Sequence, residues 1–171
     1  ARNIPVIHLE LGPLRSPDYR PTMYVDFSGV NGNSEAKKRY ERLHEPLNMS
    51  LSVRQLFEYF LSRRDALNAT GPASGSVKTG VVLQVEDDSN LIAFGNDFDN
   101  RGLLSFARLT TSIEDILVRG HPGSLFQIRA REFAVDDSDS SLAFIAKCRK
   151  IITINSSVGV ESLLQGRTVQ V

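Results

Sequence analysis

The sequence has a single cysteine, no excess of charge and no long apolar run, and each absence excludes a class of protein. Cys148 stands alone, which excludes an internal disulfide and a cysteine-based metal cluster and is typical of a reducing compartment. Lys and Arg balance Asp and Glu at 20 each, so no overall field draws the molecule onto nucleic acid or an anionic membrane. The longest apolar stretches fall far short of the roughly 20 residues that cross a bilayer. No signal peptide opens the chain, and we expect a cytoplasmic protein.

Motifs for metals and common nucleotide cofactors are also missing. The chain has no zinc-ligand spacing, no Walker loop and no Gly-rich dinucleotide fingerprint. Asp136-Asp-Ser-Asp139 resembles a metal-binding pattern, but no matching ligand cluster accompanies it, and we interpret it as a polar loop. We therefore expect no metal site.

What is present is an ordinary globular composition in which strands and helices alternate. With 171 residues and 41% hydrophobic composition, the chain can bury one substantial core or two small ones. Apolar runs predict strands at Ile4 to Leu9 (buried and parallel), Gly80 to Val85, Asp115 to Arg119, Phe126 to Phe133, Ile151 to Ile154 and from Thr168 onward. Helical patterns predict helices from Ser34, and over Ser52 to Leu67, Leu103 to Thr111, Ser141 to Arg149 and Val158 to Gln165. The alternation predicts an α/β fold with a doubly wound, mostly parallel sheet.

Loops and chain ends indicate how the fold is organised. Residues 13–34 are rich in Pro, Gly, Asn and Ser and predict an ordered loop. The segment from Asn68 to Ser76 is small, polar and interrupted by Gly and Pro, so we place a domain boundary after residue 75. Both ends look cut, because the chain opens with Ala1 and stops inside a final strand that has no expected partner. We expect an incomplete fragment of a larger fold.

Four polar clusters follow predicted strands. They are Glu10 with Gly12, the run Gln84 to Asn90, Gly120-His121-Pro122, and the run Asn155 to Glu161. In a doubly wound sheet, ligands bind at the carboxyl ends of the strands. We expect the four clusters to converge on one crevice and to meet around a single ligand.

These clusters carry groups suited to phosphate binding and to acid-base chemistry. Asn155 to Gly159 join a strand to a helix, where N–H groups and hydroxyls favour a phosphate, although an ordinary N-cap has the same composition. Glu161, one turn into that helix, either reaches ribose hydroxyls or complements the helix dipole. His121 is placed to donate to a phosphate oxygen or to protonate a leaving one, whereas a lone His is usually structural. Glu86 to Asp88 are three adjacent carboxylates, which indicates catalysis or a solvated turn.

Taken in order, the Glu-x-Gly, His-Pro and Ser-Ser motifs resemble bacterial GT-B glycosyltransferases that use CMP-activated acidic sugars. These are the sialyltransferases and the transferases of 3-deoxy-D-manno-octulosonic acid (Kdo). The chain is most similar to the retaining beta-Kdo transferases of capsule and O-antigen assembly, over most of its length except residues 35 to 75. The segments that carry this similarity are Glu10-Leu-Gly-Pro-Leu-Arg15, Gly29-Val-Asn-Gly32, Gln84-Val-Glu-Asp-Asp88, and Asn155-Ser-Ser-Val-Gly-Val-Glu161 followed by Leu-Leu-Gln-Gly-Arg-Thr-Val.

The resemblance implies a GT-B-like fold with a site for a CMP-sugar donor. The donor-binding residues that it implies are His121, Pro122, Ser156, Ser157, Glu161, Arg15 and Gln84. Glu161 is expected near the ribose and Arg15 on the carboxylate of the donor, since a guanidinium binds that group bidentately, although Arg15 also reads as a surface arginine. Because CMP leaves with one phosphate, no metal or other cofactor is required beside the donor CMP-Kdo.

The resemblance also implies a pair of catalytic carboxylates. Retention in that family is linked to a covalent glycosyl-enzyme adduct, which such a pair can form and resolve. We assign Asp88 as the nucleophile and Glu10 as the acid/base. Asp88 is preferred to Asp87 because the family's acid follows Gln84 by four residues, whereas strand alternation says only that neighbours point apart.

The implied function is transfer of Kdo from CMP-Kdo to a cell-surface polysaccharide or glycolipid. Residues 1–75 are then the end of an acceptor-side N-terminal domain with the crossover, and residues 76–171 are the C-terminal Rossmann-like domain that binds the nucleotide sugar. Such an enzyme works in the cytoplasm, and other parts of the protein or partner proteins attach it to the inner face of the inner membrane. It does not act on nucleic acid. Two alternatives stay open: an inverting sialyltransferase with Glu10 as general base, and a non-catalytic domain that binds a nucleotide or polysaccharide.

Overall fold

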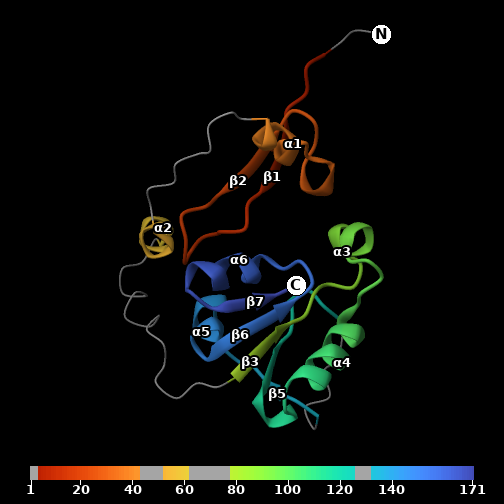
Figure 1. The fold of residues 1–171 in the computed structure, drawn as a ribbon, viewed down its shortest axis with the longest axis vertical. Coiled ribbons are helices and arrows are strands. Elements are labelled where there is room, and N and C mark those ends of the chain that lie inside the picture. Colours follow the sequence, from red (N-terminus) through yellow and green to blue (C-terminus); the bar gives the residue numbers. More distant parts are fainter. Residues whose placement is uncertain (1–3, 43–51, 62–77, 126–131) are drawn as a thin grey trace.

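A five-stranded parallel sheet forms the centre of the fold, with strand order β5-β4-β3-β6-β7 (Figure 1). The computed structural model describes residues 4–42, 52–61, 78–125 and 132–171. The strands are β3 (Lys78–Val82), β4 (Ile116–Arg119), β5 (Ala134–Val135), β6 (Cys148–Thr153) and β7 (Thr168–Gln170). Every neighbouring pair is parallel, which confirms the predicted doubly wound α/β architecture.

Helices cover both faces of this sheet because alternate side chains of its strands are apolar. On one face, Val81 and Leu83 pack with Leu103 and Leu104, and on the other Val82 packs with Phe144. The helices of the first face are α3 (Ser89–Phe94) and α4 (Asn100–Thr110), and those of the second are α5 (Ser141–Ala146) and α6 (Ser157–Leu164). Among the described residues, no helix is long and apolar enough to cross a bilayer.

The N-terminal apolar run is not a buried parallel strand, and that prediction was wrong. β1 (His8–Leu11) pairs antiparallel with β2 (Met23–Asp26) in a separate two-stranded sheet, with Glu10 opposite Tyr24. Leu9 is 60% exposed, and the apolar residues before it are also exposed. Sequence periodicity shows that a strand is apolar but not what covers it, and the partner strand lay in the segment expected to be a loop.

The segment after the hairpin is organised by the carboxylate of Asp26. Asp26 accepts hydrogen bonds from the backbone N–H and hydroxyl of Ser28 (2.7 and 2.5 Å) and from the hydroxyl of Ser34 (3.0 Å), and it pairs with Arg39. The hydrogen bonds from Ser28 hold the pKa of the Asp26 carboxyl well below its usual range. The short turn η1 (Asn31–Asn33) and helix α1 (Ala36–Glu41) follow, as Ser34 predicted.

The next helix is shorter than predicted. α2 (Val53–Phe60) begins with a capping box between Ser52 and Gln55, and it ends at Phe60, before the predicted end at Leu67. Leu61 leaves the helix because it forms a β-bridge to Tyr19 and packs against it. The predicted boundary at Asn68 to Ser76 lies outside the described residues.

The bounds of other helices and strands also differ from the predicted ones, for local reasons. β3 stops at Val82 because the backbone of Gln84 bonds to the side chain of Asn100. α5 stops at Ala146 because β6 begins at Cys148, and η3 (Ile113–Asp115) precedes β4. The strand expected at Phe126 to Phe133 lies almost wholly outside the described residues. The final strand, expected to lack a partner, pairs with β6.

Candidate functional site

A cleft of about 1100 Å³ lies between the hairpin segment and the ends of the sheet strands. Its lining comes from β1 and the loop after it, from the loops after β3, β4 and β6, and from the starts of α5 and α6. The lining includes every site residue that the sequence indicated: Glu10, Arg15, Gln84, Asp88, His121, Pro122, Ser156, Ser157 and Glu161. Their gathering in one cleft is a structural finding, whereas their roles stay predictions.

The floor of the cleft lies at the switch point of the sheet, between β3 and β6. One terminal atom of the Gln84 side-chain amide lies 2.6 Å from Oδ1 of Asn155 and 2.7 Å from the backbone nitrogen of Ser156. With its nitrogen in that place Gln84 donates to Oδ1 of Asn155, and with its oxygen there it accepts from the Ser156 N–H. Gln84 is 8% exposed, so its geometry favours bracing the loop after β6.

A buried asparagine braces the same strand end from the opposite side. The Oδ1 atom of Asn100 accepts from the Gln84 N–H at 2.9 Å, and its Nδ2 donates to the Gln84 carbonyl at 2.9 Å and to Glu86 Oε1 at 3.0 Å. Asn100 is 2% exposed. These contacts fix where the chain leaves β3 and turns toward Asp88.

Replacing Asn100 with Ala is expected to lower the free energy of unfolding by about 3 kcal/mol, because it leaves the buried N–H and carbonyl of Gln84 unpaired. Chemical denaturation measures the change. The matched control is Arg101→Ala, at the exposed neighbouring position of α4, which should change stability little. Equal stabilities of the two variants would show that the Asn100 contacts do not hold this strand end.

Of the three adjacent carboxylates after β3, Asp88 lines the cleft and the other two do not. Asp88 is the N-cap of α3, and its Oδ1 accepts from the N–H groups of Asn90 (2.8 Å) and Leu91 (3.1 Å). Both bonds go to Oδ1, and Oδ2 accepts neither of them. Glu86 accepts from the hydroxyl of Ser124 at 2.7 Å, and this bond lowers the pKa of its carboxyl.

Glu10 lies within β1, one residue before its end, close to the strand-to-loop transition that the sequence indicated. Its Oε2 is buried without a hydrogen-bond partner among the described residues. A buried unpaired carboxylate oxygen is unfavourable, which favours a ligand group at this place. Gly12 has to be glycine, because a Cβ there would lie 2.3 Å from Oγ1 of Thr22. The exposed Arg15 donates from Nε to the Gly12 carbonyl at 3.2 Å.

The imidazole of His121 has a defined tautomer. Its Nδ1 accepts a hydrogen bond from the Gly123 N–H at 3.0 Å, so the neutral ring carries its proton on Nε2. His121 and Pro122 are exposed at the end of β4, where the Nε2–H group is a donor for an anionic ligand.

The start of α6 presents hydroxyls and backbone N–H groups to the cleft. Ser156 is its N-cap, with Oγ accepting from the Val158 N–H at 3.3 Å, and Ser157 is the first helical residue. Glu161 is only 6% exposed, and its Oε2 accepts from the Ser141 hydroxyl at 2.6 Å. Burial raises the pKa of the Glu161 carboxyl. Glu161 is thus held by Ser141 of α5, and its Oε2 already accepts one hydrogen bond.

Two family models match this chain. Residues 38–171 match the capsule polysaccharide biosynthesis protein family, and residues 1–35 match the N-terminal domain of the glycosyltransferase 99 family. The chain belongs to the capsule polysaccharide biosynthesis family. No curated protein sequence matches it.

Solved structures of similar fold come from Thermosulfurimonas dismutans. The beta Kdo 2,7 transferase of KpsC has a TM-score of 0.59 and 18% identity, covering 99% of this chain and 58% of that chain. The beta Kdo 2,4 transferase of KpsC has a TM-score of 0.54 and 18% identity, covering 97% of this chain and 60% of that chain. At this identity the likeness concerns the fold, and it confirms the predicted GT-B-like class. The chain spans less than two thirds of the length of either structure.

This capsule-family cleft also contains side chains that the sequence did not indicate. Tyr24 and Phe94 line it, and so does Arg119, which donates to Asp136 at 2.5 Å and lies over the ring of Phe144. Asp136 also pairs with Lys147 at 3.0 Å. In the acidic run that resembled a metal motif, Asp136 therefore pairs with basic side chains of the protein. Nowhere in the described ranges do three His, Cys, Asp or Glu side chains gather as metal ligands.

Proposed function

We propose that the protein is a glycosyltransferase that moves Kdo from CMP-Kdo to a polysaccharide or glycolipid, with retention of configuration. The observation that carries the proposal is one cleft that holds a helix N-terminus with serines, a histidine N–H donor, and carboxylates from separate elements. Membership of the capsule polysaccharide biosynthesis family and the match of residues 1–35 to a glycosyltransferase domain support it.

The donor nucleotide occupies the side of the cleft formed by β4 and α6. Its phosphate lies at the N-terminus of α6, where the helix dipole and the hydroxyls of Ser156 and Ser157 favour an anion. The Nε2–H of His121, beside Pro122, donates to the same phosphate. Glu161 accepts from a ribose hydroxyl, and residues 76–171 form the nucleotide-binding domain, with residues 1–75 on the acceptor side.

The sugar of the donor lies between the two catalytic carboxylates. Arg15 binds its carboxylate group. Asp88 attacks the anomeric carbon through Oδ2, the bond from that carbon to the phosphate oxygen breaks, and CMP leaves with its electron pair while His121 stabilises the phosphate charge. Glu10 then takes the proton of an acceptor hydroxyl. The oxygen of that hydroxyl attacks the anomeric carbon and displaces Asp88. Two inversions give retention, and no step requires a metal.

The direct test is incubation of the full protein with CMP-Kdo. We expect release of CMP, and intact-mass spectrometry of samples without acceptor should show the protein carrying one Kdo unit. NMR should show retention in the product. Absence of CMP release at enzyme excess, or an inverted product, would contradict the proposal, and an inverted product would support the sialyltransferase-like mechanism.

Removing either of two side chains that bind the phosphate in this proposal is expected to weaken CMP binding. His121→Ala and Ser156→Ala should each lower CMP affinity by about 10- to 150-fold, because a hydrogen bond to a charged group contributes about 1.5–3 kcal/mol. Calorimetry measures the affinity. Cytidine, which lacks the phosphate, should lose no affinity in either variant.

Ser52→Ala is the matched control for Ser156→Ala, since Ser52 caps α2 and is not part of the cleft lining. It should leave CMP affinity unchanged. If His121→Ala and Ser156→Ala lost affinity for cytidine and for CMP equally, these two side chains would stabilise the fold and would not bind the phosphate.

A further inference from the structure

Two aromatic side chains in the cleft have no part in the proposed donor chemistry. Tyr24 of β2 is 48% exposed and Phe94 of α3 is 44% exposed, and both line the cleft. Their rings are large enough to dominate the contact area of a bound molecule. A half-exposed ring inside a cleft is therefore a candidate binding surface.

The strand register places Tyr24 beside the proposed acid/base. Glu10 and Tyr24 are directly opposite in the antiparallel β1–β2 pair. Opposite residues project from the same face, with Cβ atoms about 4.5–5.5 Å apart. The Tyr24 ring thus lies next to the carboxylate whose Oε2 is buried without a partner among the described residues.

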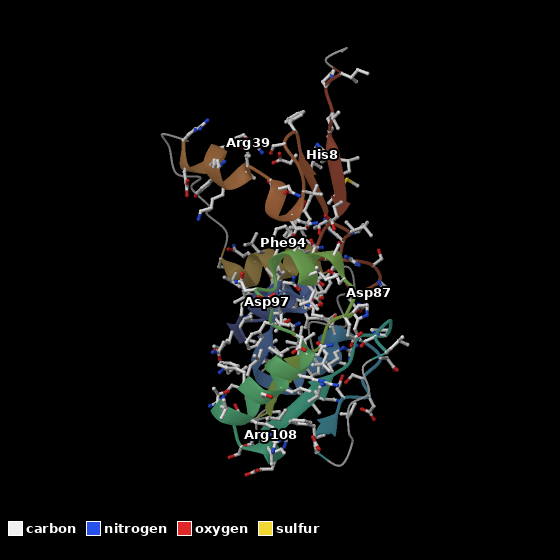
Figure 2. All side chains as sticks on the ribbon, turned by 90° about the vertical axis from the view of Figure 1, so that its right-hand side faces the viewer. His8, Arg39, Asp87, Phe94, Asp97 and Arg108 are labelled. Atoms are coloured by element: carbon white, nitrogen blue, oxygen red, sulfur yellow. The ribbon has the colours of Figure 1, made fainter. Side chains whose placement is uncertain are left out.

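Phe94 approaches the same space from the helix that Asp88 caps. Asp88 is the N-cap of α3 and Phe94 is its last residue, about 9 Å further along the helix axis, and both residues line the cleft. The backbone of Gly32 lies against the Phe94 ring, since a Cβ at Gly32 would come within 2.1 Å of it. Figure 2 shows Phe94 near the place where the hairpin segment meets the sheet domain.

Polar groups flank these rings. Asn31 and Asn90 belong to the same lining, and Asn31 has a positive φ of 56° in the η1 turn next to Gly32. Aromatic faces beside amide groups match the chemistry of a sugar ring, which has an apolar C–H face and hydroxyls at its edge. A purely apolar ligand would leave the amides and the nearby carboxylates unpaired.

We propose that Tyr24 and Phe94, with Asn31 and Asn90, form the subsite for the ring of the acceptor sugar. The proposal rests on the proposed function, because it places the acceptor hydroxyl at Glu10. In this subsite the acceptor ring stacks on Tyr24, its outer edge contacts Phe94, and its hydroxyls bond to the amides.

Binding of acceptor mimics to the full protein tests this subsite without requiring turnover. The probes are methyl glycosides of Kdo, galactose and N-acetylglucosamine, titrated by NMR in the presence of saturating CMP. We expect wild type to bind at least one of them, Tyr24→Ala and Phe94→Ala to bind it about tenfold more weakly, and Tyr24→Phe to bind it as wild type does. CMP affinity should stay unchanged in all variants.

The control is Tyr59→Ala, which removes a 57% exposed ring from α2, outside the cleft lining. Binding of no glycoside by wild type, or equal binding by wild type and Tyr24→Ala, overturns the subsite. Loss of CMP affinity in Tyr24→Ala does so as well, because the ring would then serve the donor. Failure of wild type to release CMP from CMP-Kdo would instead overturn the proposed function, so the two failures are distinguishable.

Discussion

Replacing Asp88 with Asn is expected to lower Kdo transfer by about a thousandfold or more and to abolish the covalent adduct, while CMP still binds. An amide cannot attack the anomeric carbon, and loss of a nucleophile removes the covalent route altogether. Asn is chosen because Oδ1 of Asp88 caps α3 and an Asn side chain caps a helix equally well. The measurements are CMP release, intact mass and CMP affinity.

The matched control is Asp99→Asn, because Asp99 is also an N-cap, accepting from the Gly102 N–H at 2.7 Å at the start of α4, and does not line the cleft. It should keep full activity. Asp87→Asn tests the alternative nucleophile, and since Asp87 is exposed and outside the lining, we expect it to be active. Normal turnover by Asp88→Asn together with loss in Asp87→Asn would transfer the assignment to Asp87.

The central sheet could be predicted from sequence because buried parallel strands carry their signal locally. The second halves of β3 and β6 are buried on both faces, and each strand is followed by a polar turn and a helix start. The hairpin could not be predicted, because Ile4 to Leu9 has the same composition as a buried strand. Its antiparallel pairing with Met23–Asp26 depends on long-range contacts that composition does not encode.

The convergence of Gln84, Asp88, His121 and Ser156 followed from topology, since the carboxyl ends of parallel strands meet at one edge. Glu10 reaches the cleft from the separate antiparallel hairpin, which this rule does not cover. The contacts by which Gln84 and Glu161 hold the loops in place could not be predicted in this way. Gln84 contacts Asn155 across 71 residues of sequence, and Glu161 contacts Ser141 across 20. Tyr24 and Phe94 were missed for a different reason. An aromatic residue in a short apolar segment is usually a core residue, and only the observed exposure distinguishes a binding surface.

Replacing Glu10 with Gln is expected to slow transfer to the acceptor by about 10²–10⁴-fold, the usual contribution of a general base. The first displacement, which releases CMP, does not use Glu10 in the proposed mechanism. The glycosyl-enzyme on Asp88 should therefore form and accumulate, because the acceptor hydroxyl keeps its proton. Intact mass in the presence of acceptor, together with a burst of CMP release close to one equivalent of enzyme, measures this accumulation.

Glu58→Gln is the matched control, because Glu58 pairs with Arg54 on α2 and is absent from the cleft lining. It should transfer as wild type does. Thermal unfolding of Glu10→Gln should stay close to wild type, since the change keeps the shape of a side chain whose Oε2 has no partner in the described part of the chain. A Glu10→Gln protein that turned over normally would remove the acid/base assignment, whereas one that failed to release any CMP would show that Glu10 acts in the first displacement and not the second.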